Sequence, residues 1–192
     1  MRKRRIILAS SSPRRRKLLS MLGIKFFVIA PDVSEEHYKS LSPKTLALKL
    51  AEKKVQAVAS KIKTGIVIGV DTLVIIDNKV LGKPNSRQEA REMLKLLNNN
   101  THQVISGLVV LVLPEKKLIK TTELTKVTFR KLSSREIKDY LNTQEPYDKA
   151  GAYGIQGQGG RFVKQIDGCY YNVVGLPLTK LIRILKKFGV FQ

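Results

Sequence analysis

Apolar and polar positions recur along the chain with two different periods, and these predict a mixture of strands and helices. Short continuous apolar runs at 6–9 and 66–70 are typical of strands covered on both faces. Apolar residues spaced three and four apart follow Ser12-Pro13, Ser42-Pro43 and Ser86, and each of these starts carries helix-capping chemistry. We therefore expect helices to begin at all three points.

Later segments favour paired strands. Residues 101–113 and 118–129 are predicted to form two long strands, and further strands are expected on both sides of Asp167-Gly168. Ser133 to Glu136 forms a capping-box pattern like that of Ser86 to Glu89, which predicts another helix start. Because strands and helices alternate early and strand pairs dominate later, we predict an α/β fold with a mixed, twisted central sheet flanked by helices. The 192 residues fit one domain, 1–192, whose two lobes enclose a cleft.

Charge is the unusual feature of the composition. The chain has 36 Lys and Arg against 15 Asp and Glu, a formal net charge of +21, which favours polyanionic partners such as nucleic acid, anionic lipid or nucleotide phosphates. Solvated surface lysines explain the same excess.

Cys169 is the single cysteine, and no apolar run reaches the ~20 residues needed to span a bilayer. We expect a soluble, cytoplasmic protein with no membrane partner.

Asp71 is the leading catalytic candidate. The apolar run 66–70 stops at Asp71-Thr72, and residues 73–76 are expected to continue extended toward a turn at Asp77-Asn78. Open α/β sheets bind their ligands outside the carboxyl ends of the strands. A turn or capping role is the alternative for Asp71. Thr72 could orient a ligand or hydrogen-bond to the backbone.

Basic residues near other element ends suit a phosphate ligand. The segment from Ser10 to Arg16 follows the first strand and opens a helix, where free N–H groups and the helix dipole favour anions, and we choose Arg14 as the ligand contact. Lys54 takes the i+7 position of a stripe that begins at Ala47, so helical periodicity turns it inward, with snorkelling to a groove edge as the alternative. Lys83, between Gly82 and Pro84, could present its ammonium to phosphate, although such a tripeptide usually marks a surface turn.

The segment 145–160 holds five glycines, which predicts a ligand-hugging or a mobile loop. It matches neither a Walker A loop nor a dinucleotide fingerprint. Gln156 within it offers a donor and an acceptor for a base edge. Glu35 or Glu36 could hold Mg²⁺ together with Asp71, or simply belong to an acidic loop. His102 is interpreted as structural.

Taken together, and in this order, five motifs resemble the Maf family of nucleotide pyrophosphatases over nearly the whole chain: Leu8 to Arg15, Gly69 to Thr72, Gly82 to Pro84, Glu145 to Gly157, and Asn172 to Leu178. The resemblance implies a Maf/ITPase-like fold and hydrolysis of a nucleoside triphosphate to the monophosphate and pyrophosphate. It also implies a divalent metal cation (Mg, Mn or Co) and a carboxylate that accepts a proton. Residues 148–156 are similar to the branch that acts on dTTP and UTP.

The resemblance also assigns roles. Asp71 matches the proton acceptor, Lys54 and Lys83 match active-site cations, and Glu35 matches a metal-site carboxylate beside Asp71, with Glu36 left open by the loop register. The residues assigned to substrate binding and specificity are Ser10, Arg14, Thr72, Asp148, Lys149 and Gln156. A homodimer is compatible with the family. As an alternative, the chain is a basic nucleic-acid-binding or nucleotide-sensing protein without turnover. In the first case the basic surface would bind the nucleic acid.

Overall fold

The computed structural model describes residues 4–33 and 41–191. The elements, in chain order, are β1 (Ile6–Ala9), α1 (Pro13–Ser20), β2 (Phe27–Ile29), α2 (Pro43–Ala59), β3 (Gly65–Ile76), β4 (Lys79–Leu81), α3 (Arg87–Leu97), β5 (Thr101–Leu113), β6 (Lys117–Phe129), α4 (Ser134–Tyr140), the 3₁₀ turns η1 (Glu145–Asp148), η2 (Ala150–Ala152) and η3 (Gln158–Phe162), β7 (Val163–Asp167), α5 (Tyr170–Val174) and α6 (Leu178–Lys186). Among these helices, none combines the length and the apolar character that crossing a membrane demands.

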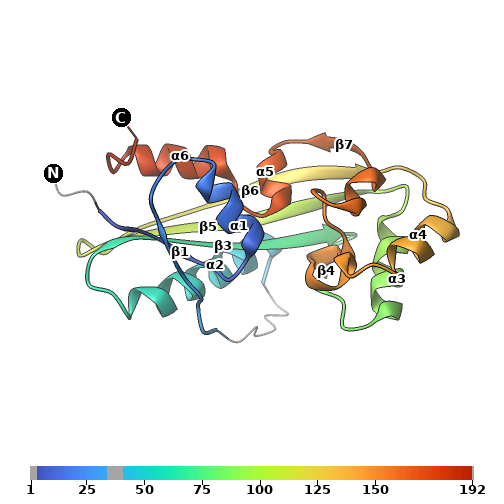
Figure 1. Cartoon of the computed structure of the whole chain (residues 1–192), viewed down its shortest axis with the longest axis horizontal. Helices are drawn as coiled ribbons and strands as arrows, with labels where there is room; N and C mark the ends of the chain where they lie inside the picture. The colour runs from blue at the N-terminus through green and yellow to red at the C-terminus, as the bar shows by residue number, and fades with distance from the viewer. Residues whose placement is uncertain (1–3, 34–40, 192) are drawn as a thin grey trace. The chain divides into compact units, whose positions relative to one another are not determined.

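The strands form one mixed sheet in the order β2-β1-β3-β5-β6-β7, with β4 paired to β3. β1 runs parallel to both β2 and β3, whereas β4 and β7 run antiparallel to β3 and β6. Helices flank the sheet (Figure 1). The predicted α/β class with a mixed sheet is therefore confirmed.

The chain divides into two compact units. The first comprises residues 1–71, 106–123 and 175–192, and the second comprises residues 72–105 and 124–174. The long strands β3, β5 and β6 contribute residues to both units. This division agrees with the two predicted lobes, while the cleft and the single-domain assignment stay predictions.

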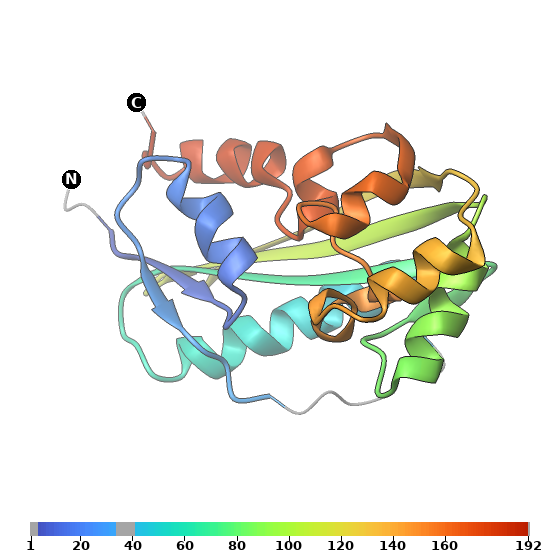
Figure 2. The same cartoon turned by 45° about the vertical axis from the view of Figure 1, so that its right-hand side comes forward.

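In the first unit, α2 covers one face of the strands and α1 and α6 cover the other, as Figures 1 and 2 both show. α1 begins with Pro13 behind the N-cap Ser12, whose side chain accepts a hydrogen bond from the Arg15 amide. α2 begins in the same way at Pro43 behind Ser42. Both helix starts predicted from Ser-Pro pairs are confirmed, and they orient the residues that follow.

Two strand glycines let α2 lie unusually close to the sheet. A Cβ atom on Gly107 of β5 would lie 2.3 Å from the carbonyl oxygen of Ala47, and one on Gly69 of β3 would lie 2.7 Å from the carbonyl oxygen of Ala51. Around this contact, Ala47, Ala51 and Val55 are fully buried. Small residues on both surfaces thus allow backbone-to-backbone packing, and this packing sets the distance of every α2 side chain from the sheet.

In the second unit, α3 packs against α4, η1 and η2. An aromatic cluster fills the core, with ring centroids of Phe129 and Tyr153 4.8 Å apart and those of Tyr140 and Phe162 also 4.8 Å apart. His102 lies within this cluster at 1% exposure, and its Nε2 is 2.8 Å from the hydroxyl oxygen of Tyr153. Burial lowers the pKa of His102 to about 4, so the ring is neutral near pH 7, in keeping with the structural interpretation.

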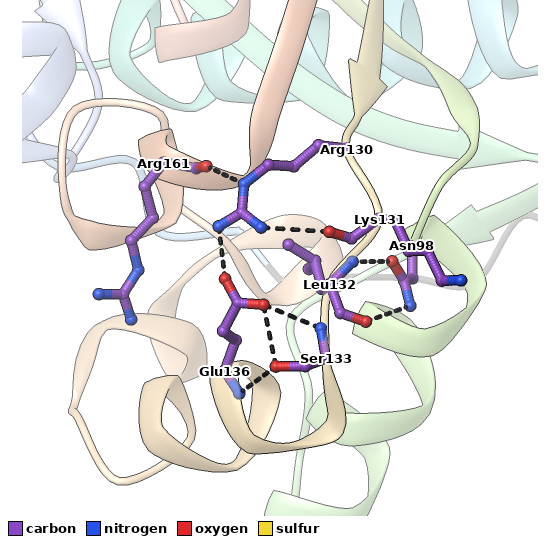
Figure 3. A network of polar contacts seen from close by, with 7 residues as sticks. All are labelled: Asn98, Arg130, Lys131, Leu132, Ser133, Glu136 and Arg161. Carbon is purple, nitrogen blue, oxygen red and sulfur yellow. Dashed lines mark hydrogen bonds and ion pairs between the residues drawn. The ribbon is translucent and has the colours of Figure 1, made fainter.

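A polar network joins the end of β6 to α3, α4 and η3 (Figure 3). Arg130 donates to a carboxylate oxygen of Glu136 at 2.6 Å and to the carbonyl oxygen of Arg161 at 2.9 Å. Glu136 also accepts from the amide of Ser133, whose hydroxyl in turn accepts from the Glu136 amide. The predicted capping box at Ser133 is therefore confirmed, and hydrogen bonds from Arg130 and Ser133 lower the pKa of Glu136 to about 2.

The capping-box prediction at Ser86 is only half correct. The Ser86 hydroxyl accepts from the Glu89 amide at 3.1 Å, but the Glu89 carboxylate accepts from the amide of Asn85. Asn85 also offers its side-chain amide at 3.2 Å, which draws the Glu89 carboxylate one residue further back along the chain. The helix start is confirmed, while the reciprocal bond of a capping box goes to a different residue.

The strand expected after Asp167-Gly168 is wrong, because residues 170–174 form the helix α5. Gly168 takes a φ of +119°, which ends β7. The buried side-chain amide of Asn172 then donates to the carbonyl oxygen of Val104 and to the hydroxyl of Thr125. These long-range bonds fix the segment as a helix although its tyrosines and valines favour a strand.

We predict that Gly107→Ala lowers the free energy of unfolding by about 2 kcal/mol, because the added methyl group meets the α2 backbone. Urea denaturation followed by circular dichroism measures this. The control is Gly82→Ala, where a Cβ meets nothing within 4 Å and stability should stay near that of the parent protein. Equal stability of the two variants would contradict the close packing of α2.

Candidate active site

Asp71 lies inside β3 and not at its end, which corrects the sequence prediction. β3 continues to Ile76 because residues 74–76 pair with β4. The parallel neighbour β1, however, ends at Ala9, which pairs with Gly69 two residues before Asp71. Asp71 on β3 therefore lies just beyond the carboxyl end of the neighbouring parallel strand, β1.

Lys54 of α2 forms an ion pair with Asp71. Its ammonium donates to Oδ1 of the carboxylate, and the two side chains are 19% and 14% exposed. Lys54 sits between the buried residues Ala51 and Val55 of α2, so the inward direction predicted from the helical period is confirmed. The pair is mostly shielded from water but still reachable by a ligand.

Arg15 adds a second positive charge near Asp71, and the sequence prediction did not assign it a role. Its Nε donates to the carbonyl oxygen of Gly175 at 2.9 Å, which turns the side chain inward. Burial lowers the pKa of the Arg15 guanidinium, the charge of Asp71 opposes this shift, and the charge of Arg14 adds to it. The electrostatic coupling places Arg15 in the field of the Asp71 carboxylate.

Helix phase explains which arginines of α1 face inward. Arg15 precedes the buried Leu18 by three residues and the buried Leu19 by four, so it lies on the inward face of α1. Arg14 is half-buried at the edge of that face, whereas Arg16 is exposed. The same phase was available in the sequence and could have indicated Arg15. Ser10, just after β1, is 3% exposed, and its hydroxyl accepts from the Ser12 amide at 3.1 Å. We call Ser10, Arg14, Arg15, Lys54 and Asp71 the Asp71 cluster.

The glycine-rich segment of the second unit is organised by Glu145. Its Oε2 accepts from the amide of Gln158 at 2.8 Å, and its Oε1 accepts from the amide of Gly159 at 3.0 Å and from the hydroxyl of Tyr140 at 3.0 Å. A Cβ on Gly157 would lie 2.3 Å from Oε2. The backbone thus wraps around a carboxylate of the protein itself. The ligand-hugging and the mobile interpretations of this loop both stay predictions.

Lys149 and Asp148 stiffen the same loop. The Lys149 ammonium donates to the carbonyl oxygen of Glu145 at 2.8 Å and forms an ion pair with Asp148. Its aliphatic carbons approach Gly154, where an added Cβ would lie 2.6 Å from Cε. Both residues therefore shape the loop, and their assignment to substrate binding stays a prediction.

Lys83 and Gln156 occupy exposed positions of the second unit. The carbonyl oxygen of Gly82 accepts from the Gly151 amide at 3.0 Å, so the loop that carries Lys83 is attached to η2. Gln156 lies between the buried Gly154 and the amides that bind Glu145. Thr72 is the half-buried residue that follows Asp71 in β3. Their predicted roles stay predictions.

The predicted metal site falls only in part on the described residues. Glu35 and its alternative Glu36 lie outside the described residues, and within 4–33 and 41–191 no three potential ligands from His, Cys, Asp and Glu come together. The Asp71 carboxylate alone suits a hard divalent cation, since Mg²⁺ is commonly held by one or two carboxylates and the phosphates of a substrate. The divalent cation therefore stays a prediction.

A family model described as Maf-like protein matches residues 5–188. The chain belongs to the Maf family. Relatives include a dTTP/UTP pyrophosphatase of Carboxydothermus hydrogenoformans, 50% identical over 185 residues, which covers 96% of this chain and 99% of the relative. Proteins of the same name from Bacillus anthracis and Bacillus cereus are 46% identical over 187 residues, 97% of each chain. The resemblance inferred from the motifs is thereby confirmed for this Maf protein.

We predict that Glu145→Ala in this Maf protein accelerates hydrogen exchange at the amides of Gln158 and Gly159, because both lose a charged acceptor. The loss of these charge-assisted bonds should lower the free energy of unfolding by about 2 kcal/mol. Residue-resolved exchange by NMR measures the first effect. Gln156→Ala, which changes an exposed side chain of the same loop, serves as the control and should leave both amides protected. Unchanged protection in Glu145→Ala would contradict the organising role.

Proposed function

We propose that the chain is a nucleoside triphosphate pyrophosphatase that hydrolyses dTTP and UTP to the monophosphate and pyrophosphate, and so removes surplus or modified pyrimidine nucleotides. The observation that carries the proposal is the half-buried Lys54–Asp71 pair, with Arg15 in the field of the carboxylate. Relatives of almost equal length bear the name dTTP/UTP pyrophosphatase, which supports the substrate class.

The proposed reaction is attack of water at the α-phosphorus. Asp71 accepts a proton from the water as its oxygen bonds to phosphorus, the bond from phosphorus to the oxygen bridging to the β-phosphate breaks, and pyrophosphate leaves with the electron pair. Lys54 holds the carboxylate in place through the ion pair. Lys54 and Arg15 supply fixed positive charge where negative charge spreads over the phosphate oxygens.

A divalent cation (Mg, Mn or Co) held by Asp71, with Glu35 as the second proposed ligand, would neutralise phosphate charge when bound. In the second unit, Lys83 is proposed to contribute a further cation. Arg14, Thr72 and Gln156 are proposed to select the pyrimidine, and Ser10, Asp148 and Lys149 to shape the binding surface. A cytoplasmic location and a homodimer remain predictions.

The alternative, a nucleic-acid-binding or nucleotide-sensing protein without turnover, receives no support from the comparisons, since the relatives bear the name of an enzyme. The central carboxylate also argues against it. A site designed only to retain phosphate has no evident need for a half-buried negative charge among its cations. The net charge of +21 is explained by neither function alone.

We predict that Asp71→Asn reduces the rate of pyrophosphate release from dTTP by roughly 10³-fold, because the amide cannot accept the proton. The assay measures pyrophosphate across pyrimidine, purine and modified triphosphates with Mg²⁺, Mn²⁺ or Co²⁺, and circular dichroism checks the fold. Near-normal turnover in Asp71→Asn would remove Asp71 from the proposed role. Activity of the parent enzyme on purine triphosphates alone would overturn the substrate class.

A matched pair of arginine variants tests the residue that the structure adds. Arg15→Gln should lower kcat/KM for dTTP at least tenfold, roughly the effect of losing one fixed charge that stabilises a transition state. Arg16→Gln changes the exposed neighbour and should stay within about twofold, as expected for a solvated charge. Equal effects of the two substitutions would show that only net charge matters and not the inward position of Arg15.

A further inference from the structure

The second unit carries a hollow of about 540 Å³ formed by residues of α3 and α4 and the turn that follows α4. Its lining consists mainly of basic side chains, namely Arg87, Arg91, Arg135 and Lys138, together with Ser134, Asp139 and Leu141. We call it the α3–α4 hollow. It shares no residue with the Asp71 cluster or with the loop around Glu145.

The positive charges of the α3–α4 hollow are scarcely neutralised by protein groups. Arg87 donates to the carbonyl oxygen of Leu141 at 2.6 Å and to the side-chain oxygen of Asn142 at 2.7 Å, both of which are uncharged. The guanidinium is therefore held in place by partners that do not neutralise it. Arg135 approaches Asp139 only to 3.9 Å. Within the described residues, Arg91 and Lys138 form no ion pair at all.

The other acids of α3 and α4 are engaged elsewhere. Glu136, one residue after Arg135, is bound by Arg130 and by Ser133, as Figure 3 shows. On α3, Glu89 accepts from Asn85, and Glu92 accepts from Lys95 at 3.0 Å. Each carboxylate has a local partner away from the hollow. The lining of the hollow thus contains four cations and a single acid, Asp139.

Four cations around one hollow repel one another, and the repulsion is relieved when an anion of high charge density enters. Guanidinium groups match the oxygens of a phosphate in geometry and charge, and lysine adds a point charge. A hollow of this volume falls in the range of small-molecule sites. Arg87 and Arg91 lie one turn apart on α3, and Arg135 and Lys138 lie one turn apart on α4, so both walls offer a pair of donors.

We propose that the α3–α4 hollow is a second anion site, which binds a small phosphate-bearing ligand such as pyrophosphate or the phosphate chain of a nucleotide. The site is separate from the Asp71 cluster and requires no turnover there. Because pyrophosphate is also a product of the proposed reaction, ligand binding at the hollow must be measured separately from catalysis.

The test is calorimetric titration of the full chain with pyrophosphate at low salt. The hollow variant is Arg91→Gln combined with Lys138→Gln, two exposed changes on opposite walls. The control is Lys61→Gln combined with Lys63→Gln, which removes the same charge from exposed positions of the first unit. We expect one class of pyrophosphate site to weaken at least tenfold in the hollow variant, roughly the loss of one charge-assisted bond, and to persist in the control.

Two further readouts locate the site and separate it from the catalytic function. Backbone NMR signals of residues 87–91 and 134–141 should shift when pyrophosphate is added to the parent chain. Pyrophosphate release from dTTP should be retained by the hollow variant, whereas Asp71→Asn should lose release and keep the binding at the hollow. Failure of the catalytic proposal therefore leaves this one intact.

Three outcomes would overturn the proposal. Identical titrations of the hollow variant and the control would show that the lining residues bind nothing. Equal affinity for sulfate and pyrophosphate would indicate a general counter-ion atmosphere and no phosphate site. Binding of short single-stranded DNA at the hollow without binding of pyrophosphate would assign the surface to nucleic acid.

Discussion

The close approach of α2 to the strands is the constraint on which the catalytic cluster depends. Gly107 and Gly69 remove the side chains that would keep the helix backbone away from the sheet. Lys54 can then reach Asp71 across a short distance, with most of both side chains shielded. A half-buried carboxylate without that partner would carry an uncompensated desolvation cost, so the helix packing and the electrostatics of the cluster support each other.

A comparable dependence on one carboxylate holds in the second unit. Glu145 gathers two backbone amides and the Tyr140 hydroxyl, and Gly157 is required because its position leaves no room for a Cβ. The glycines of this segment therefore reflect close wrapping around an anion of the protein itself. A loop of this kind can present Gln156 in a defined place, which a freely mobile loop could not do.

The cations of the Asp71 cluster and those of the α3–α4 hollow differ in how protein carboxylates are placed around them. Near Asp71, the cations Lys54 and Arg15 surround a carboxylate of the protein. Around the α3–α4 hollow, four cations line the surface with a single acid, Asp139, and the nearby Glu136 is bound by Arg130. The first arrangement suits chemistry at a bound phosphate, and the second suits retention of one.

The sequence by itself determined the α/β class, the capped starts of α1 and α2, the inward direction of Lys54 and the membership of the Maf family, because periodicity, cap residues and motifs are local patterns. It predicted Asp71 at a strand end, but pairing of residues 74–76 with β4 extended the strand. It predicted a strand after Gly168, where the long-range bonds of Asn172 made a helix. Only the tertiary structure showed that Arg15 bonds to Gly175, that Glu145 organises its loop and that Glu136 binds Arg130. The sequence could not predict these contacts because each one joins residues that no local pattern links.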